Sequence, residues 1–223
     1  MSHPAVSRAV TLRDGTAVRL RPIGPEDKRL LIDAFERLSE KSRYRRFFTS
    51  LPELSPGALT YFTEVDHSNH EAIIAIDPKS GRAVGVARYI RVSEDPEAAE
   101  VAVVVVDDWQ GRGIGRALLT RLTNRARREG ISRFLAVVQA DNRDAMSLLA
   151  GFANSTRERE GSILELAVEI PRRRGIGAEL ARLLRAAAAG AISHSPRHSG
   201  ARSRQSSRHA ARRHGSNDQL KGP

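Results

Sequence analysis

The strongest hydrophobic pattern in the chain is a run of valines followed by a glycine-rich stretch and an amphipathic segment. Residues 101–106 are valine at every position except Ala102. A continuous run of β-branched residues predicts a strand buried on both faces. After Gly115 the period changes to that of a helix, with one apolar face made of Leu118, Leu119, Leu122 and Ala126. The pattern therefore predicts strand, tight loop and helix in that order.

The rest of the first 170 residues alternates between apolar runs and turn residues. A first strand is predicted from short runs at 10–12 and 17–20 around an Asp14-Gly15 turn. Helices are predicted to begin near Pro25, Ser39, Ser55 and Asp141. Further strands are predicted at 71–76, 83–90, 134–138, 155–159 and 162–169, with Asp95–Glu97 turning into the valine strand. This order predicts a mixed α/β sheet of about seven strands with helices on both faces.

The loop between the valine strand and the helix, Gln110-Gly-Arg-Gly-Ile-Gly115, has the composition of an anion site. Its three glycines permit a tight turn and a close approach of backbone to ligand. The helix that follows starts with unpaired N–H groups and the positive end of its dipole. A P-loop is excluded because no Gly-Lys-Ser/Thr follows, and the dinucleotide fingerprint because its third glycine is replaced by Arg116.

Gln-x-x-Gly-x-Gly after a strand resembles the acetyl-CoA loop of the GCN5-related N-acetyltransferase (GNAT) family. The resemblance extends over residues 10–170 in the order of elements. It implies that Gln110, Gly111, Arg112, Gly113, Ile114, Gly115 and Arg116 surround the CoA pyrophosphate. It also implies that the valine strand parts from its parallel neighbour, so that a slot opens for the pantetheine arm. A glycine-rich turn without a ligand is the alternative.

The resemblance also assigns roles around the slot. A backbone N–H near Val103 or Val105 would polarise the thioester carbonyl. Asn142 resembles the asparagine that opens the last helix and bonds the pantetheine arm, although a helix cap is its plain interpretation. Glu100, at the start of the valine strand, matches a glutamate base in several family members. An otherwise apolar strand would favour the uncharged form of this carboxyl group, so that it could take up a proton within the pH range in which such an enzyme works. The alternative is an exposed, inert carboxylate, and Asp66, His67 and His70 are rival bases.

One family feature is missing. Many members carry a tyrosine seven positions after the asparagine as general acid, and here Leu149 stands there. We therefore name no general acid. Pat-type bacterial protein lysine acetyltransferases commonly lack this tyrosine, and residues 38–48 resemble their acceptor region. The alternative for residues 38–48 is two packed helices with solvated arginines.

Charge divides the chain in two. The net charge is +11, and the segment 171–223 contains 12 Lys/Arg against 2 Asp/Glu. We expect a domain over 1–170 and a basic tail over 171–223, with one helix at 176–189 and disorder beyond it. The positive charge of the tail predicts weak binding to polyanions. The alternative is an extension without a function. Cysteine is absent, and no long apolar run or secretory signal occurs, so cytoplasmic residence without disulfides is expected.

The sequence thus predicts an acetyl-CoA-dependent N-acetyltransferase without a metal, acting on a primary amine. A protein lysine is favoured over small amines. The alternatives are a CoA-binding regulatory module without catalysis and a nucleic-acid adaptor in which the tail is the main feature. The oligomeric state does not follow from the sequence.

Overall fold

The computed structural model describes residues 7–150 and 155–170, without the side chains of 155–159. The chain divides into two units, residues 1–173 and 174–223, and all described elements belong to the first. The predicted basic tail, with its helix at 176–189, lies outside the described residues.

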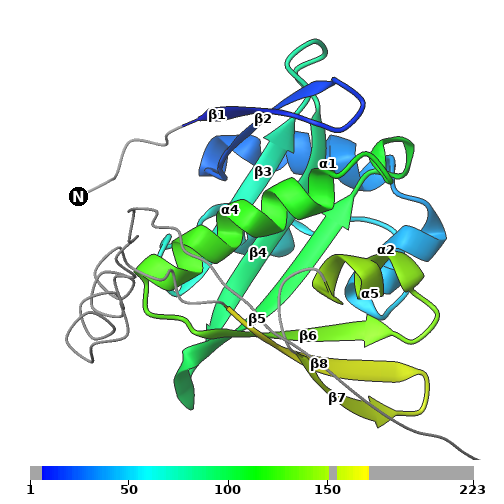
Figure 1. The fold of residues 1–223 in the computed structure, drawn as a ribbon. Coiled ribbons are helices and arrows are strands. Elements are labelled where there is room, and N and C mark those ends of the chain that lie inside the picture. Colours follow the sequence, from blue (N-terminus) through cyan, green and yellow to red (C-terminus); the bar gives the residue numbers. More distant parts are fainter. Residues whose placement is uncertain (1–6, 151–154, 171–223) are drawn as a thin grey trace, which may run out of the picture. The chain divides into compact units, whose positions relative to one another are not determined.

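Within these described residues, eight strands and five α-helices follow one another in the order that the hydrophobic pattern predicts (Figure 1). The strands are β1 (Arg8–Thr11), β2 (Ala17–Pro22), β3 (His70–Ile76), β4 (Ala83–Val92), β5 (Asp95–Val105), β6 (Arg133–Gln139), β7 (Ser155–Glu160) and β8 (Ile163–Glu169). The helices are α1 (Lys28–Glu36), α2 (Glu40–Phe47), α3 (Pro56–Thr63), α4 (Ile114–Arg128) and α5 (Arg143–Ala150).

All described strands form one sheet in the order β1-β2-β3-β4-β5-β6-β8-β7. Every pairing is antiparallel except that of β5 with β6, which are joined through α4. The mixed α/β fold is confirmed. The eighth strand arises because the two runs expected to make one strand pair with each other as β1 and β2. Gly15 permits the turn between them at φ +81°, and Asp14 Oδ1 accepts the Thr16 N–H at 2.9 Å.

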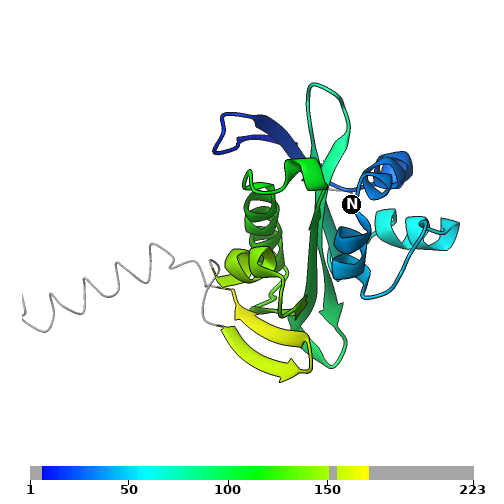
Figure 2. The same ribbon diagram turned by 90° about the vertical axis from the view of Figure 1, so that its right-hand side faces the viewer.

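Helices cover both faces of the sheet (Figure 2). On one face, α4 buries Leu118, Leu119, Leu122 and Ala126 in a core cluster that also contains Leu149 of α5. On the other face, α1 and α3 contribute Leu31 and Leu59 to a second cluster. The helix boundaries follow the predicted caps: Ser39 accepts the Ser42 N–H, Ser55 accepts the Ala58 N–H, and Gly130 ends α4 at φ +78°.

The valine strand is less buried than its composition predicts. Residues 101–105 are only half-buried, whereas Ala98 and Ala99 at the start of β5 are fully buried. The reason is that β5 and β6 pair over three positions only, Ala98–Glu100 against Arg133–Leu135, and then diverge. The turn into β5 also comes earlier than expected, at residues 93–94, so that Asp95–Glu97 already lies in the strand.

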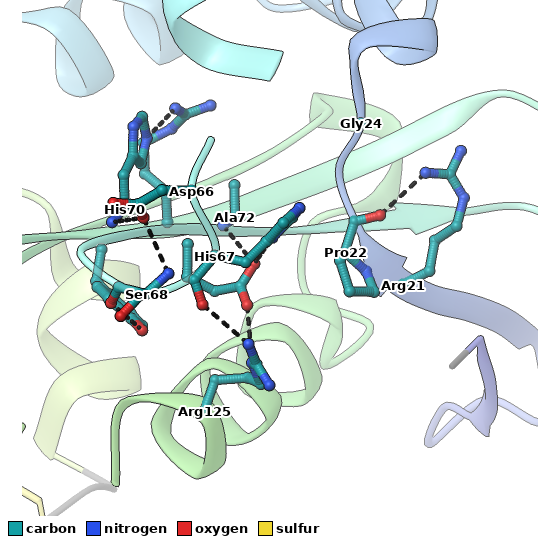
Figure 3. A network of polar contacts seen from close by, with 12 residues as sticks. Arg21, Pro22, Gly24, Asp66, His67, Ser68, His70, Ala72 and Arg125 are labelled. Carbon is teal, nitrogen blue, oxygen red and sulfur yellow. Dashed lines mark hydrogen bonds and ion pairs between the residues drawn. The ribbon is translucent and has the colours of Figure 1, made fainter. Parts of the chain in front are cut away.

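A buried carboxylate that the sequence did not indicate joins α4 to the sheet (Figure 3). Glu71 on β3 is 0 % exposed. One of its oxygens accepts the Arg125 Nε–H at 2.8 Å, and the other lies 2.8 Å from His67 Nδ1. Arg125 also donates to the His67 carbonyl at 2.9 Å. The pair therefore satisfies a charge that is removed from water and ties the helix to the loop before β3.

Replacing Arg125 with methionine should destabilise the protein, because the buried carboxyl group of Glu71 would lose its guanidinium partner. We expect the free energy of unfolding in urea to fall by about 2–4 kcal/mol. The control is Lys28→Met, which breaks an ion pair whose side chains are 38 % and 46 % exposed and should cost less than about 1 kcal/mol. Equal losses in the two variants would contradict a structural role for the buried pair.

Candidate active site

A cleft of about 1130 Å³ opens where β5 and β6 part. Its walls are the separating ends of the two strands, the glycine loop with the start of α4, α5, and the end of α2. Nine of the ten predicted cofactor-binding residues line it: Val103, Val105, Gln110, Gly111, Gly113, Ile114, Gly115, Arg116 and Asn142. The predicted base, Glu100, lines it as well. The structure thus gathers these predicted residues around one cavity.

The edge of β5 that faces the cleft offers backbone groups from alternate residues. The Val106 N–H donates to the Val84 carbonyl on β4 at 3.0 Å. Because the polar groups of successive strand residues point to opposite edges, those of Val103 and Val105 point away from β4. Past Glu100, β6 no longer pairs with that edge. The two positions that the resemblance assigned to backbone donors therefore have the correct orientation.

The glycine loop presents the start of a 15-residue helix to the cleft. Gly111 and Gly113 have φ +75° and +93°, and a Cβ at either position would meet no atom within 4 Å. The first intrahelical bond of α4 runs from the Ala117 N–H to the Gly113 carbonyl at 3.0 Å, so the amides ahead of it precede the ladder. A loop open to the cleft with helix amides behind it suits a diphosphate.

Gly115 lines the cleft and also has a packing role that the sequence did not indicate. It lies inside α4, and its φ is not positive. A Cβ there would come within 3.2 Å of Leu148 Cδ2 and 3.9 Å of Val103 Cγ1. Its missing side chain therefore permits α5 to pack closely against α4.

Gln110 fixes the loop. Its Nε2 donates to the Val105 carbonyl at 3.0 Å and to Ser42 Oγ at 3.4 Å. Asp107, just ahead, accepts from the Ser39 N–H at 2.9 Å and from the hydroxyls of Ser39 and Ser42 at 2.9 and 2.8 Å. These bonds hold the loop, the end of β5 and the start of α2 as one assembly.

Arg112 points away from the cleft. It does not line the cavity; its guanidinium lies 4.8 Å from the Trp109 ring centroid and 3.7 Å from Asp14 Oδ2. Trp109 is itself partly buried and packed against the core around α4. Of the two loop arginines, only Arg116 lines the cleft.

Asn142 caps α5. Its Oδ1 accepts the Ala145 N–H at 3.2 Å, while the residue itself borders the cleft. Leu149, which replaces the tyrosine of many family members, is buried in the core around α4 and also borders the cleft. This position therefore supplies no proton donor.

Glu100 stands at the point where β5 leaves β6, on the face opposite α4. Val101, Val103 and Val105 pack toward the α4 core, so Glu100, Ala102 and Val104 point to the face of α1 and α3. Glu100 is exposed, so the apolar surroundings expected for it are absent. They are absent because the parting of the strands opens this position to the cleft.

The rival bases do not line the cleft: Asp66 and His67 lie in the loop before β3, and His70 is the first residue of β3. Asp66 accepts the N–H groups of Ser68, Asn69 and His70 (Figure 3), which hold the loop and lower the pKa of its carboxyl. His67 pairs with Glu71. His70 Nε2 lies 3.0 Å from Arg88 Nη1, and burial together with that cation lowers the pKa of His70 to about 4. These residues therefore have structural roles.

Several cleft residues come from the far side of the sheet. Arg45, Arg46, Phe47 and Phe48 at the end of α2 line the cavity, and so does Arg88 on β4. The region 38–48 thus takes part in the cleft. Sequence reasoning did not single out Arg88, although an arginine inside the apolar run 83–90 was the available signal.

The described part of the chain contains neither a metal-binding cluster nor a membrane-spanning helix. No group of three or more His, Asp or Glu side chains in it is arranged to hold a metal ion. Nor is any helix there long and apolar enough to cross a membrane.

Comparison with known proteins agrees with this geometry. The model of the acetyltransferase (GNAT) family matches residues 32–152. An acetyltransferase of Pseudomonas aeruginosa is 34 % identical over 135 residues, which cover 60 % of this chain and 72 % of that protein. The acetyltransferase Pat of Mycolicibacterium smegmatis is 35 % identical over 133 residues, 60 % of this chain and 40 % of Pat.

Solved structures give the same result. The GNAT domain of S. lividans PAT superposes with a TM-score of 0.70 at 32 % identity, covering 76 % of this chain and all of that domain. A cAMP-binding acyltransferase from Mycobacterium smegmatis gives 0.56 at 29 %, covering 81 % of this chain and 53 % of its own. The chain therefore spans about half or less of these longer Pat and acyltransferase relatives. The family match and the fold together show that this chain belongs to the acetyltransferase (GNAT) family and is similar to Pat.

Proposed function

We propose that the protein transfers the acetyl group of acetyl-CoA to a primary amine, with a protein lysine as the favoured acceptor. The observation that carries the proposal is the parting of β5 and β6 beside the N-terminus of α4. One strand edge with open backbone groups and one open glycine loop suit the two parts of CoA, its amide-containing arm and its pyrophosphate. Acetyl-CoA would supply the activated thioester.

The cleft residues fit that co-substrate. The open space over Gly111 and Gly113 leaves room for phosphate oxygens next to the amides that start α4. Val103 and Val105 would direct backbone donors at the arm and the thioester oxygen. Asn142 lines the cleft while its side-chain oxygen caps α5, so its amide nitrogen would be the group available to the arm. Arg116 lines the cleft and remains a candidate for contact with a phosphate. Arg112 is oriented toward Trp109 instead, which argues against a phosphate contact by Arg112.

Glu100 would remove the proton from the acceptor. A lysine amine is protonated at neutral pH and must lose a proton before its nitrogen attacks the thioester carbonyl. The new C–N bond forms as the C–S bond breaks, and CoA leaves as a thiolate that takes a proton from solvent. The position of Glu100, at the cleft where the strands part, supports this role.

The favoured acceptor, a protein lysine, rests on the similarity to Pat and to the S. lividans PAT domain. The cleft reaches the end of α2, within the segment that resembles the acceptor region of Pat-type enzymes. A CoA-binding module without catalysis is the second candidate, and the apolar Leu149 in place of a proton donor favours it.

Replacing Gly113 with alanine should weaken acetyl-CoA binding at least roughly 10-fold, because a Cβ would enter the open space over the loop. Calorimetry with acetyl-CoA measures the effect. Gly81→Ala is the matched control: Gly81 also has a positive φ and open space, but it lies in the β3–β4 turn away from the cleft. Equal affinity of both variants for acetyl-CoA would show that the glycine loop is not part of the binding site.

Replacing Glu100 with glutamine keeps the side chain's shape and removes the base. Turnover should fall roughly 10²–10⁴-fold while acetyl-CoA affinity is kept. A thiol-release assay over a range of pH measures the loss and any change in the acidic limb of the profile. Turnover and profile equal to those of the unaltered protein would assign the base elsewhere.

Cutting the chain after Arg185 should separate the basic tail from the chemistry. None of the proposed site residues lies beyond Asn142, so acetyl-CoA affinity and turnover on a small amine should change less than about 3-fold. Retention on heparin should weaken and lose its steep salt dependence, because fewer cations remain to displace counterions. Lost turnover with an intact circular dichroism spectrum would place the tail in the active site.

A further inference from the structure

Two arginines at the acceptor side of the cleft are held on neighbouring aromatic rings. The Arg88 guanidinium lies 4.4 Å from the centroid of Phe62, and that of Arg46 lies 4.8 Å from the centroid of Phe47. The two ring centroids are 6.3 Å apart. Packing on neighbouring rings, rather than ion pairs, therefore orients the two guanidinium groups.

Neither guanidinium is neutralised by a carboxylate in the described part of the chain. Arg88 is only 6 % exposed, and its polar contacts are His70 Nε2 at 3.0 Å and the Phe62 carbonyl at 3.3 Å. Burial and the neighbouring Arg46 cation lower the pKa of Arg88. His70 is uncharged at neutral pH and is no counter-ion. A buried cation beside a second cation is unfavourable unless an anion joins them.

Both arginines open onto the cleft next to the proposed base. Arg88 pairs with Ala102 in the sheet register, and Glu100 pairs with Ile90. Arg88 and Glu100 are thus diagonal neighbours on one face, with side chains that start roughly 7–8 Å apart. The glycine loop, in contrast, is at the far end of β5. An anion at the arginines would therefore be close to the acceptor amine.

We propose that Arg46 and Arg88 form a binding site for a carboxylate carried by the acceptor, a few ångströms from the amine that is acetylated. The inference rests on the proposed acetyl transfer and narrows its substrate class. Two planar guanidinium groups provide the donor geometry that suits a carboxylate. The carboxylate would belong to an Asp or Glu next to a lysine in a protein, or to a small amino acid.

Matched acceptor pairs test the proposal. One pair is 6-aminohexanoate and 6-aminohexanamide, which have the same shape and differ in the charge of one end. The other is a short blocked peptide with the sequence Gly-Lys-Glu-Gly and its Gly-Lys-Gln-Gly counterpart. We expect kcat/KM to be roughly 10–100-fold higher for the acid in at least one pair. The pair that shows the preference identifies the source of the carboxylate.

Variants of the two arginines then test whether they cause the preference for the acid. In Arg46→Met and Arg88→Met the acid-to-amide ratio of kcat/KM should fall to about 1, and Arg46→Lys should restore part of it. Arg29→Met removes an exposed arginine on α1 and should leave the ratio unchanged. Arg88 is buried, so the Arg88→Met variant can fail to fold. In that case the Arg46→Met variant still tests the proposal.

The outcomes separate the possible failures. Transfer to acid and amide at equal rates would overturn the carboxylate site and leave the acetyltransferase function in place. Absence of thiol release with all four acceptors and with longer lysine peptides would overturn the proposed function itself. A roughly 10-fold loss of acetyl-CoA affinity in Arg46→Met, measured by calorimetry without acceptor, would assign the arginines to the co-substrate and also overturn the proposal.

Discussion

The limited pairing of β5 with β6 is the constraint on which the active site depends. Three residue pairs hold the strands together, and beyond Glu100 they diverge. The backbone groups of Val103 and Val105 then face a cavity instead of a ladder partner. Such a gap is stable only if other contacts brace it. Gln110 and Asp107 provide them by bonding the end of β5, the glycine loop and α2.

The two faces of β5 contribute to different parts of the cleft. The α4 face carries the valine side chains and continues into the glycine loop, where helix amides suit phosphate oxygens. The opposite face carries Glu100, and Arg46 of α2 and Arg88 of β4 line the cleft with it. Because side chains alternate along a strand, one segment serves both the proposed co-substrate and the proposed acceptor.

Buried charge is handled in two different ways in this fold. Glu71 is fully buried but has two nitrogen partners, Arg125 and His67, so it stabilises the docking of α4. Arg88 is nearly as buried, yet its described contacts are a neutral imidazole, a carbonyl and a ring. The first arrangement is complete within the protein, whereas the second has capacity for a ligand anion.

The sequence by itself determined the order of elements, the helix caps and the glycine loop, because these follow from local periodicity and turn chemistry. It also indicated Glu100, Val103, Val105 and Asn142 through the family resemblance. The tertiary structure decided the rest. Half-burial of the valine strand, the outward turn of Arg112 and the packing role of Gly115 all depend on neighbours distant in sequence. The Glu71–Arg125 pair and the Arg46–Arg88 pair join different elements, so no local pattern reveals them.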